Sequence, residues 1–158
     1  MQKNILIFAI IFIMLFLDIN CMAQNQTNNP KTNKEKIFTI QAPKPIGPYS
    51  QAIKVGNTLY VSGQIALDKN TNNLIQGGTS AEAKVVLDNI KAIIEKANFT
   101  MDDIVKVTIY LKNLDDFSKV NEIYEKYFKS GNYPARETVE VSRLPKGANI
   151  EISVIASK

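Results

Sequence analysis

The sequence predicts an α+β fold, a two-layer sandwich in which two helices cover one face of a single mixed sheet. Two segments carry apolar residues at helical spacing, and each has only one apolar stripe. The other apolar segments are short β-branched runs or alternate with polar residues, as half-buried strands do. The order along the chain is strands, helix, strand, helix, strands, and two single-stripe helices can both pack on one face of a sheet.

Composition and charge restrict the chemistry that this chain can perform. It has 158 residues, 45% hydrophobic and 22% charged, as expected for one globular domain with a core. The formal net charge is +4, but residues 37–158 hold 15 basic and 13 acidic residues, a surplus too small to predict a nucleic-acid surface. The chain has no histidine, which excludes His-based triads and most zinc sites, and its single cysteine excludes an intrachain disulfide.

Residues 1–23 have the pattern of a secretory signal peptide. A lysine precedes an uncharged apolar run at 5–17, whose 13 residues suit a signal core better than a membrane-spanning helix. Cys21 and Ala23 fit the small-x-small cleavage pattern, so we expect a mature chain that starts at Gln24, has no membrane span and is periplasmic or secreted. The alternatives are an uncleaved anchor and a lipoprotein acylated at Cys21.

The chain after the signal divides into a linker and one folded domain. Residues 24–36 contain no large apolar side chain, so they cannot bury enough surface to offset the entropy of ordering, and they predict a disordered linker. Residues 37–158 contain all the strand-like and helix-like segments and predict the folded domain.

The strands in the first half of the domain are predicted by β-branched runs between turn residues. The runs at 52–55 and 58–62 flank Gly56-Asn57, a dipeptide typical of tight hairpin turns. A shorter run at 37–40 predicts the first strand. Residues 67–78 are rich in charged, Asn and Gly residues and predict a loop.

The helices and the later strands follow from their periodicity. Thr79-Ser80-Ala81-Glu82 matches a capping box, and the apolar stripe that begins there reaches Ala97. Alternation predicts a half-buried strand at 105–111, and the apolar residues from Phe117 to Phe128 predict the second helix. Two final strands are predicted at 138–142 and 149–155.

One face of the predicted sheet is left without helices, and we expect a partner subunit to cover it. The side chains that are out of phase with the core on the later strands are about half polar. They include Thr108, Tyr110, Thr138, Glu140, Glu151 and Ser153.

Glu151 and Arg136 are the main candidates for a chemical role. Glu151 alternates with Ile150 and Ile152, so it points away from the helices, either as an ordinary strand carboxylate or as a group that positions water in a subunit cleft. Arg136 lies where a Pro-led loop enters a strand. Its guanidinium suits a carboxylate ligand, although a surface salt bridge is the more common role of such a residue. Tyr49 and Ser62 have equally ordinary interpretations, as a packed turn residue and a strand end.

Short segments spread over the predicted domain form a recognisable series. They are 42–52 (APKPIGPYSQA), 61–65 (VSGQI), 87–93 (LDNIKAI), 101–108 (MDDIVKVT), 114–117 (LDDF), 134–136 (PAR), 139–141 (VEV), 143–148 (RLPKGA) and 150–152 (IEI). Together these segments resemble the motifs of the RidA (reactive intermediate deaminase A) family, in order, from about Ile37 to Ala156.

The resemblance implies a chorismate-mutase-like fold assembled as a homotrimer, with three clefts between subunits. It implies a deaminase that needs no cofactor or metal and hydrolyses 2-imino and enamine acids, of the 2-iminobutanoate and 2-iminopropanoate type, to 2-oxo acids and ammonia. Arg136 would bind the substrate carboxylate and Glu151 would hold the attacking water. The cleft would be lined by Tyr49, Ser62, Asn121 and Thr138.

Two positions depart from the family pattern, and two other functions stay open. Glu137 replaces a small residue, which puts the charge of the cleft in question, and Thr138 replaces a cysteine that is reactive in many members. The same trimer could bind a small carboxylate or a partner without turnover, since fold does not fix function. Endoribonuclease activity is the third reading, and the near-neutral domain without histidine argues against it.

Overall fold

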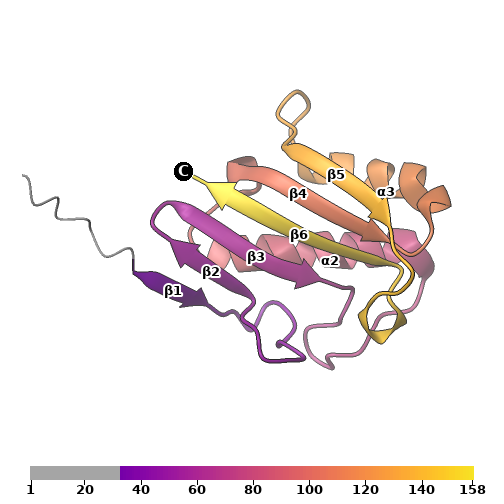
Figure 1. Ribbon diagram of the computed structural model, residues 1–158, viewed down its shortest axis with the longest axis horizontal. Coiled ribbons are helices and arrows are strands. Elements are labelled where there is room, and N and C mark those ends of the chain that lie inside the picture. The colour runs from indigo at the N-terminus through magenta and orange to yellow at the C-terminus, as the bar shows by residue number, and fades with distance from the viewer. Residues whose placement is uncertain (1–32) are drawn as a thin grey trace, which may run out of the picture. The chain divides into compact units, whose positions relative to one another are not determined.

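The computed structural model describes residues 33–158, so the predicted signal segment and most of the predicted linker lie outside the described residues. Within this range, six strands form one sheet in the order β1-β2-β3-β6-β4-β5, and the helices α2 and α3 lie behind it (Figure 1). The predicted α+β sandwich is confirmed. The elements are β1 (Lys34–Ile37), β2 (Ala52–Val55), β3 (Thr58–Gln64), α2 (Gly78–Lys96), β4 (Ile104–Leu111), α3 (Phe117–Tyr124), β5 (Ala135–Glu140) and β6 (Ile150–Ser157).

The sheet is mixed, because β5 runs parallel to β4 while all other neighbours are antiparallel. The parallel pair is joined through α3, as a crossover connection requires. The last strand of the chain, β6, lies in the centre of the sheet between β3 and β4. Any side chain on β6 therefore has neighbours on both sides.

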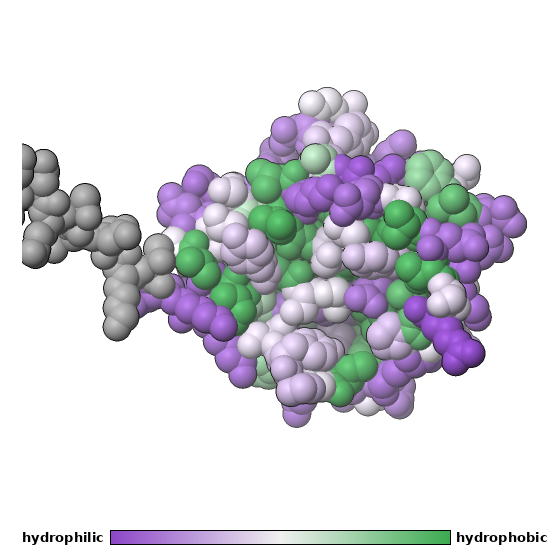
Figure 2. Space-filling view, in the orientation of Figure 1, coloured by the Kyte–Doolittle hydropathy of each residue, from purple (hydrophilic) through white to green (hydrophobic). Residues whose placement is uncertain are grey.

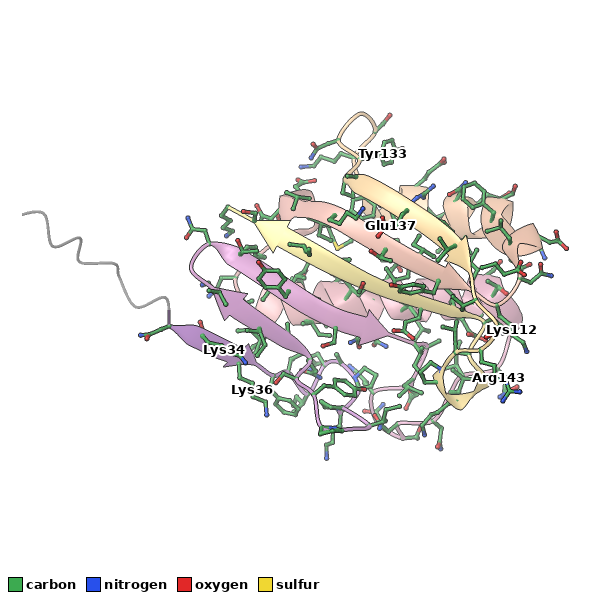
Figure 3. All side chains as sticks on the ribbon, in the orientation of Figure 1. Lys34, Lys36, Lys112, Tyr133, Glu137 and Arg143 are labelled. Atoms are coloured by element: carbon green, nitrogen blue, oxygen red, sulfur yellow. The ribbon has the colours of Figure 1, made fainter. Side chains whose placement is uncertain are left out.

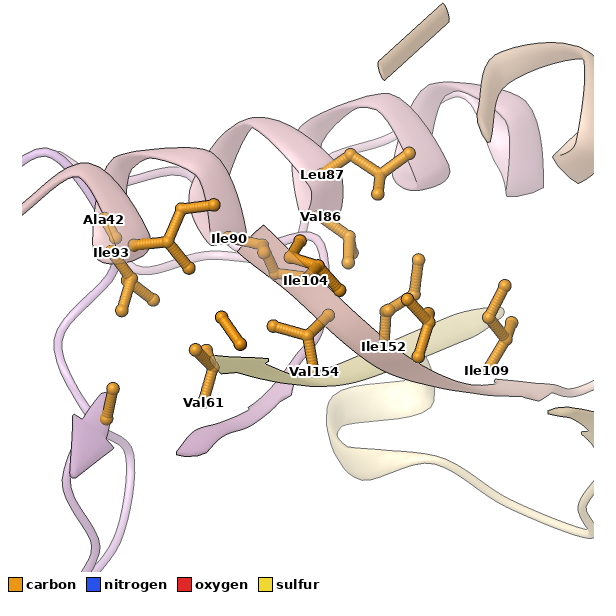
Figure 4. Close-up of a cluster of buried hydrophobic side chains, with 14 of the residues drawn as sticks. Ala42, Val61, Val86, Leu87, Ile90, Ile93, Ile104, Ile109, Ile152 and Val154 are labelled. Carbon is orange, nitrogen blue, oxygen red and sulfur yellow. The ribbon is translucent and has the colours of Figure 1, made fainter. Parts of the chain in front are cut away.

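The core lies between the sheet and α2 (Figure 4). Val86, Ile90 and Ile93 form the stripe of α2 that packs on Ile109 of β4 and Ile152 of β6, and all five side chains are completely buried. On β6 the burial alternates strictly along the strand. The face opposite the core therefore presents Glu151 and the other odd-numbered residues of β6.

The opposite face of the sheet is not covered by helices, and Figure 2 shows apolar and polar residues interspersed on it. Tyr60 on β3 and Val139 on β5 are 50% and 44% exposed there. In the described part of the chain, this face therefore has no second layer over it.

The strand phase of β5 corrects one prediction. Val107 of β4 pairs with Arg136, so Arg136, Thr138 and Glu140 lie on the helix side of the sheet. The prediction had placed Thr138 and Glu140 on the uncovered face. The side chain of Glu140 accepts a hydrogen bond from the backbone N–H of Leu114, the first residue of the short 3-10 turn that leads into α3.

The first strand also lies elsewhere than predicted. β1 ends at Ile37 and includes Lys34–Lys36, which had been assigned to the linker. The chain leaves the sheet after Ile37 because the buried Gln51 side chain binds both the N–H and the carbonyl oxygen of Thr39. β5 in turn begins at Ala135, three residues before the predicted start.

The prediction that Thr79 and Glu82 form a capping box at the start of the helix is wrong. α2 begins after Gly77, and no side chain caps it. Thr79 Oγ1 instead donates a hydrogen bond to Asp116 Oδ2 at 2.5 Å, and the buried Glu82 carboxylate accepts hydrogen bonds from the backbone and side-chain amides of Asn149. These polar groups tie the first turn of α2 to the entrances of α3 and β6.

None of the helices in residues 33–158 has the length and apolar character needed to cross a bilayer.

Candidate functional site

The Glu151 carboxylate lines a cavity of about 270 Å³ on the uncovered face of the sheet. β6 positions the side chain, because its neighbours Ile150 and Ile152 are fixed in the core on the other face. The cavity is closed by residues from the turn at 46–49, the end of β3 and the loop before β6. Its lining consists of Ile46, Tyr49, Ser62, Gly63, Ile65, Pro145 and Glu151.

Burial is the main influence on the Glu151 carboxylate. It raises the pKa of this group above the ordinary range of a glutamate, because the charged form loses water. Among the ion pairs of the described residues, none involves Glu151. A desolvated carboxylate without a cationic partner can take up a proton more readily than an exposed one, which suits a general base.

The absence of a side chain at Gly63 leaves room for the Glu151 carboxylate. A Cβ at position 63 would overlap Glu151 Oε1 and lie 2.8 Å from the carboxyl carbon, so only glycine leaves this space free. The pairing of β3 with β6 is irregular between Val61 and Gln64, on either side of this contact. The group that approaches the backbone at this glycine is thus a side chain of the same protein.

Tyr49 and Ser62 lie in the Glu151 cavity, and both are also held by the backbone. Tyr49 Oη accepts a hydrogen bond from the N–H of Ile46, and Ser62 Oγ donates one to the carbonyl oxygen of Ser50 at 2.7 Å. The buried amide of Gln51 donates to carbonyl oxygens of the 39–43 segment. Sequence reasoning missed Gln51, because no pattern marks a polar residue that is buried to bind a loop.

Arg136 lines a second cavity, of about 330 Å³, with Asn121, Tyr124, Glu125, Tyr133 and Pro134. The guanidinium carbon lies 4.7 Å from the centre of the Tyr124 ring and 5.6 Å from that of Phe117. In the described part of the chain, Arg136 forms no ion pair with a carboxylate. The surface salt bridge that is the common role of such an arginine is therefore not the one seen here.

Thr138 and Glu137 lie on opposite faces of β5. Thr138 is on the same face as Arg136, and its buried hydroxyl oxygen has no hydrogen-bond partner. Glu137 is on the uncovered face (Figure 3), and Lys106 and Thr108 both donate hydrogen bonds to its carboxylate. These bonds lower the pKa of Glu137. In a single chain, Glu137 therefore adds no charge to the Arg136 cavity.

The strand register separates Arg136 from Glu151. Arg136 pairs with Val107 and Glu151 pairs with Tyr110, and these two residues of β4 point to opposite faces. Three of the predicted site residues, Glu151, Tyr49 and Ser62, share one cavity. Arg136 and Asn121 share the other, and Thr138 lies on their side of the sheet.

The aromatic residues around Arg136 were missed as site residues. Phe117 and Tyr124 fit the apolar stripe of a helix, which is how the sequence presents them, and only the approach of β5 brings Arg136 onto them. Among residues 33–158, no three acidic, cysteine or histidine side chains cluster in a way that could hold a metal ion.

Comparison with known proteins shows close relatives. The sequence model of the family described as Endoribonuclease L-PSP matches residues 39–158. A RutC family protein of Pyrococcus abyssi is 56% identical over 125 residues, which are 79% of this chain and 98% of the relative. The human 2-iminobutanoate/2-iminopropanoate deaminase is 48% identical over 120 residues, 76% of this chain and 87% of the relative.

A solved structure has the same fold. The crystal structure of RidA from an Antarctic Psychrobacter is 44% identical, with a TM-score of 0.76 over 78% of this chain and 99% of the other. At this identity the likeness extends beyond the fold to the family.

Proposed function

The chain belongs to the RidA family, also called the YjgF or endoribonuclease L-PSP family, and on that premise we propose that it hydrolyses reactive 2-imino and enamine acids to 2-oxo acids and ammonia. The observation that carries the proposal is a complementary pair of groups, each without a charged partner among residues 33–158. Arg136 is a cation in an open cavity, and Glu151 is a desolvated carboxylate in another.

The proposed site requires more than one copy of the chain. Since Arg136 and Glu151 face opposite sides of the sheet, the Arg136 cavity of one copy must meet the Glu151 cavity of another. We propose a homotrimer with three such clefts, in which the uncovered face of each copy packs against the β5 edge of the next. The exposed Tyr60 and Val139 support a contact there. Light scattering should give three times the protomer mass of 17.6 kDa if the whole chain is retained.

The reaction needs only positioning and proton transfer. The guanidinium of Arg136 would bind the substrate carboxylate and orient the imine carbon, C2. Glu151 would take a proton from a water molecule as the water oxygen bonds to C2 and the C=N electron pair moves to nitrogen; returning that proton to the nitrogen gives the carbinolamine. Glu151 would then take the hydroxyl proton of the carbinolamine and deliver it to the nitrogen as the C–N bond breaks, so ammonia leaves and the 2-oxo acid forms. Water is consumed, and Glu151 ends in its starting state.

Tyr49, Ser62, Asn121 and Thr138 would complete the walls of the cleft. The hydroxyl of Ser62 is already bonded to a backbone carbonyl, so its contribution would be a fixed oxygen that can still accept a hydrogen bond. The buried hydroxyl of Thr138 has no partner in the described chain. The cleft therefore offers both acceptors and donors beside the two charged groups.

The test is an assay of the purified protein with 2-aminoacrylate and 2-iminobutanoate generated in situ, following the 2-oxo acid above its spontaneous formation. Arg136→Ala should lose most activity, since a charge-assisted contact of this kind is worth about 2–5 kcal/mol. Glu151→Gln should slow turnover by about 10²-fold or more.

Matched controls are Arg143→Ala, at the only other arginine, and Glu95→Gln, at an exposed position of α2. Both should retain the parent rate. Parent-level activity in both Arg136→Ala and Glu151→Gln would refute this site. Tight carboxylate binding without turnover in the parent would favour a binding module instead.

We also propose that the protein is exported. The relatives match only about four fifths of this chain, and the N-terminal pattern read from the sequence lies in the remaining part. N-terminal sequencing of the protein from fractionated native cells should find Gln24 beyond the inner membrane. A chain that starts at acylated Cys21 would instead be a lipoprotein, and full-length protein in the cytosol would refute export.

A further inference from the structure

Arg136 is held by aromatic rings where an arginine is ordinarily held by a carboxylate. Its guanidinium carbon lies within 6 Å of two ring centres, that of Tyr124 at 4.7 Å and that of Phe117 at 5.6 Å. These are the distances at which a cation is attracted to the face of a ring. Glu125 lines the same cavity, but it forms no ion pair with Arg136 within the described residues. We call Tyr124 and Phe117 the aromatic seat.

Of the two residues of the seat, Tyr124 is the tightly packed one, while Phe117 is 37% exposed. Tyr124 is 3% exposed, and its ring packs on Phe128 with the ring centres 4.5 Å apart. Its hydroxyl is buried without a hydrogen-bond partner among the described residues, and burial raises the pKa of Tyr124 to about 12. The phenol is therefore neutral at any physiological pH. What it offers to Arg136 is the face of its ring.

The helix α3 presents the seat because of its spacing. Phe117, Asn121 and Tyr124 are separated by four and three residues, so they follow one another along a single side of the helix. That side faces β5, where Arg136 projects toward the helix layer. The same side thus supplies two rings under the guanidinium and one amide beside it in the cavity.

We propose that Tyr124, assisted by Phe117, is a positioning residue that fixes the Arg136 guanidinium while leaving its N–H groups free for the carboxylate of the substrate. A carboxylate in the place of the ring would occupy those donors and cancel the charge. A ring face attracts the cation without accepting its N–H groups. The inference rests on the proposed function only in naming the bound anion as the substrate.

The position of Arg136 can be observed directly, because the chain has two arginines, Arg136 and the exposed Arg143. In an NMR spectrum of the protein, the Nε–H signal of Arg136 should be displaced by the ring currents of the seat, and that of Arg143 should not. Arg143→Lys assigns the two signals. Tyr124→Leu should move the Arg136 signal toward the position of Arg143, whereas Tyr124→Phe, which keeps the ring, should leave it displaced.

Two further variants separate the seat from general loosening of the helix. Phe117→Leu should produce a smaller shift than Tyr124→Leu, because its ring centre is farther from the guanidinium. Tyr127→Leu is the matched control, since Tyr127 packs on the α2 side and bonds to Asp88. Equal displacement of the Arg136 signal by Tyr127→Leu and Tyr124→Leu would overturn the proposal.

Ligand affinity gives the functional measure. Pyruvate, a 2-oxo acid, serves as the probe, and its dissociation constant should rise about tenfold in Tyr124→Leu and stay near the parent value in Tyr124→Phe. In the imine assay Tyr124→Leu should raise KM more than it lowers kcat. Unchanged pyruvate affinity in Tyr124→Leu would overturn the proposal. A parent that binds pyruvate in this pattern but hydrolyses no imino acid would refute the proposed function and support the seat.

Discussion

Glu151 occupies the space that a side chain at position 63 would need, since a Cβ on Gly63 would lie 2.8 Å from the Glu151 carboxyl carbon. The carboxylate is therefore confined by the backbone of the neighbouring strand. Its location depends on the size of residue 63, although Gly63 itself bears no reactive group.

Gly63→Ala should consequently disable the site. The added methyl group forces the carboxylate out of its place, and we expect a loss of activity comparable to that of Glu151→Gln, about 10²-fold. Unfolding in denaturant should show a loss of about 1–3 kcal/mol, as is usual for overpacking. In the Glu151→Gln background, Gly63→Ala should cause little further loss of activity, because the two changes act on one group. Independent, multiplying effects on the rate would contradict this account.

Glu151→Gln should be more stable than the parent at neutral pH but not at acidic pH. The folded-state pKa of Glu151 is raised, so the stability that its protonated form contributes is present below the ordinary glutamate pKa and is lost as pH rises through the raised value. Relative to the parent, the melting temperature of Glu151→Gln should thus be similar near about pH 4 and higher at about pH 7. Glu95→Gln serves as the control. A lower melting temperature at neutral pH would show that the charged carboxylate is stabilised by the fold.

Mixed assemblies test whether the site is shared between copies. In randomly mixed trimers of Arg136→Ala and Glu151→Gln, a cleft is intact when one copy supplies Glu151 and its neighbour supplies Arg136, which is true of about one quarter of the clefts. Co-expression should therefore restore about one quarter of the parent activity from two nearly inactive variants. If mixed trimers form and remain inactive, both groups must come from the same chain.

Glu82→Gln should destabilise the entrance to β6. The Glu82 carboxylate accepts hydrogen bonds from two N–H groups of Asn149, and an amide can accept only one of them while turning a donor toward the other. We expect a loss of about 1–3 kcal/mol in the free energy of unfolding. The exposed Glu122→Gln on α3 is the control. Equal stability of the two variants would mean that this buried contact contributes little.

The alternation of burial on β6 was predictable, and so was the face of Glu151, because three large aliphatic residues, Ile150, Ile152 and Val154, fix the phase of that strand. β5 was not predictable in the same way. It is an edge strand whose segment, ARETVE, has one large apolar residue, and that residue, Val139, points away from the core. Pairing with β4 decides the phase of such a strand, and this pairing is a long-range contact that local pattern does not report.

The contacts of single residues were harder still to foresee. Thr79 and Glu82 have the spacing of a capping box, yet their partners, Asp116 and Asn149, lie 37 and 67 positions away in the chain. Local rules favour the local partner, and in this protein tertiary hydrogen bonds replace it. The aromatic seat could not be recognised from the sequence because core packing and cation binding use the same residue types.

The central place of β6 determines when this chain can fold. As the polypeptide emerges from the ribosome, β1, β2 and β3 can pair as a meander, and β4 can pair with β5, but the two halves of the sheet have no strand in common until β6 appears. The two halves must therefore stay separate until residues 150–157 have been made. A chain that stops before Ile150 would lack the strand that joins the two halves, so we expect it not to reach the folded state.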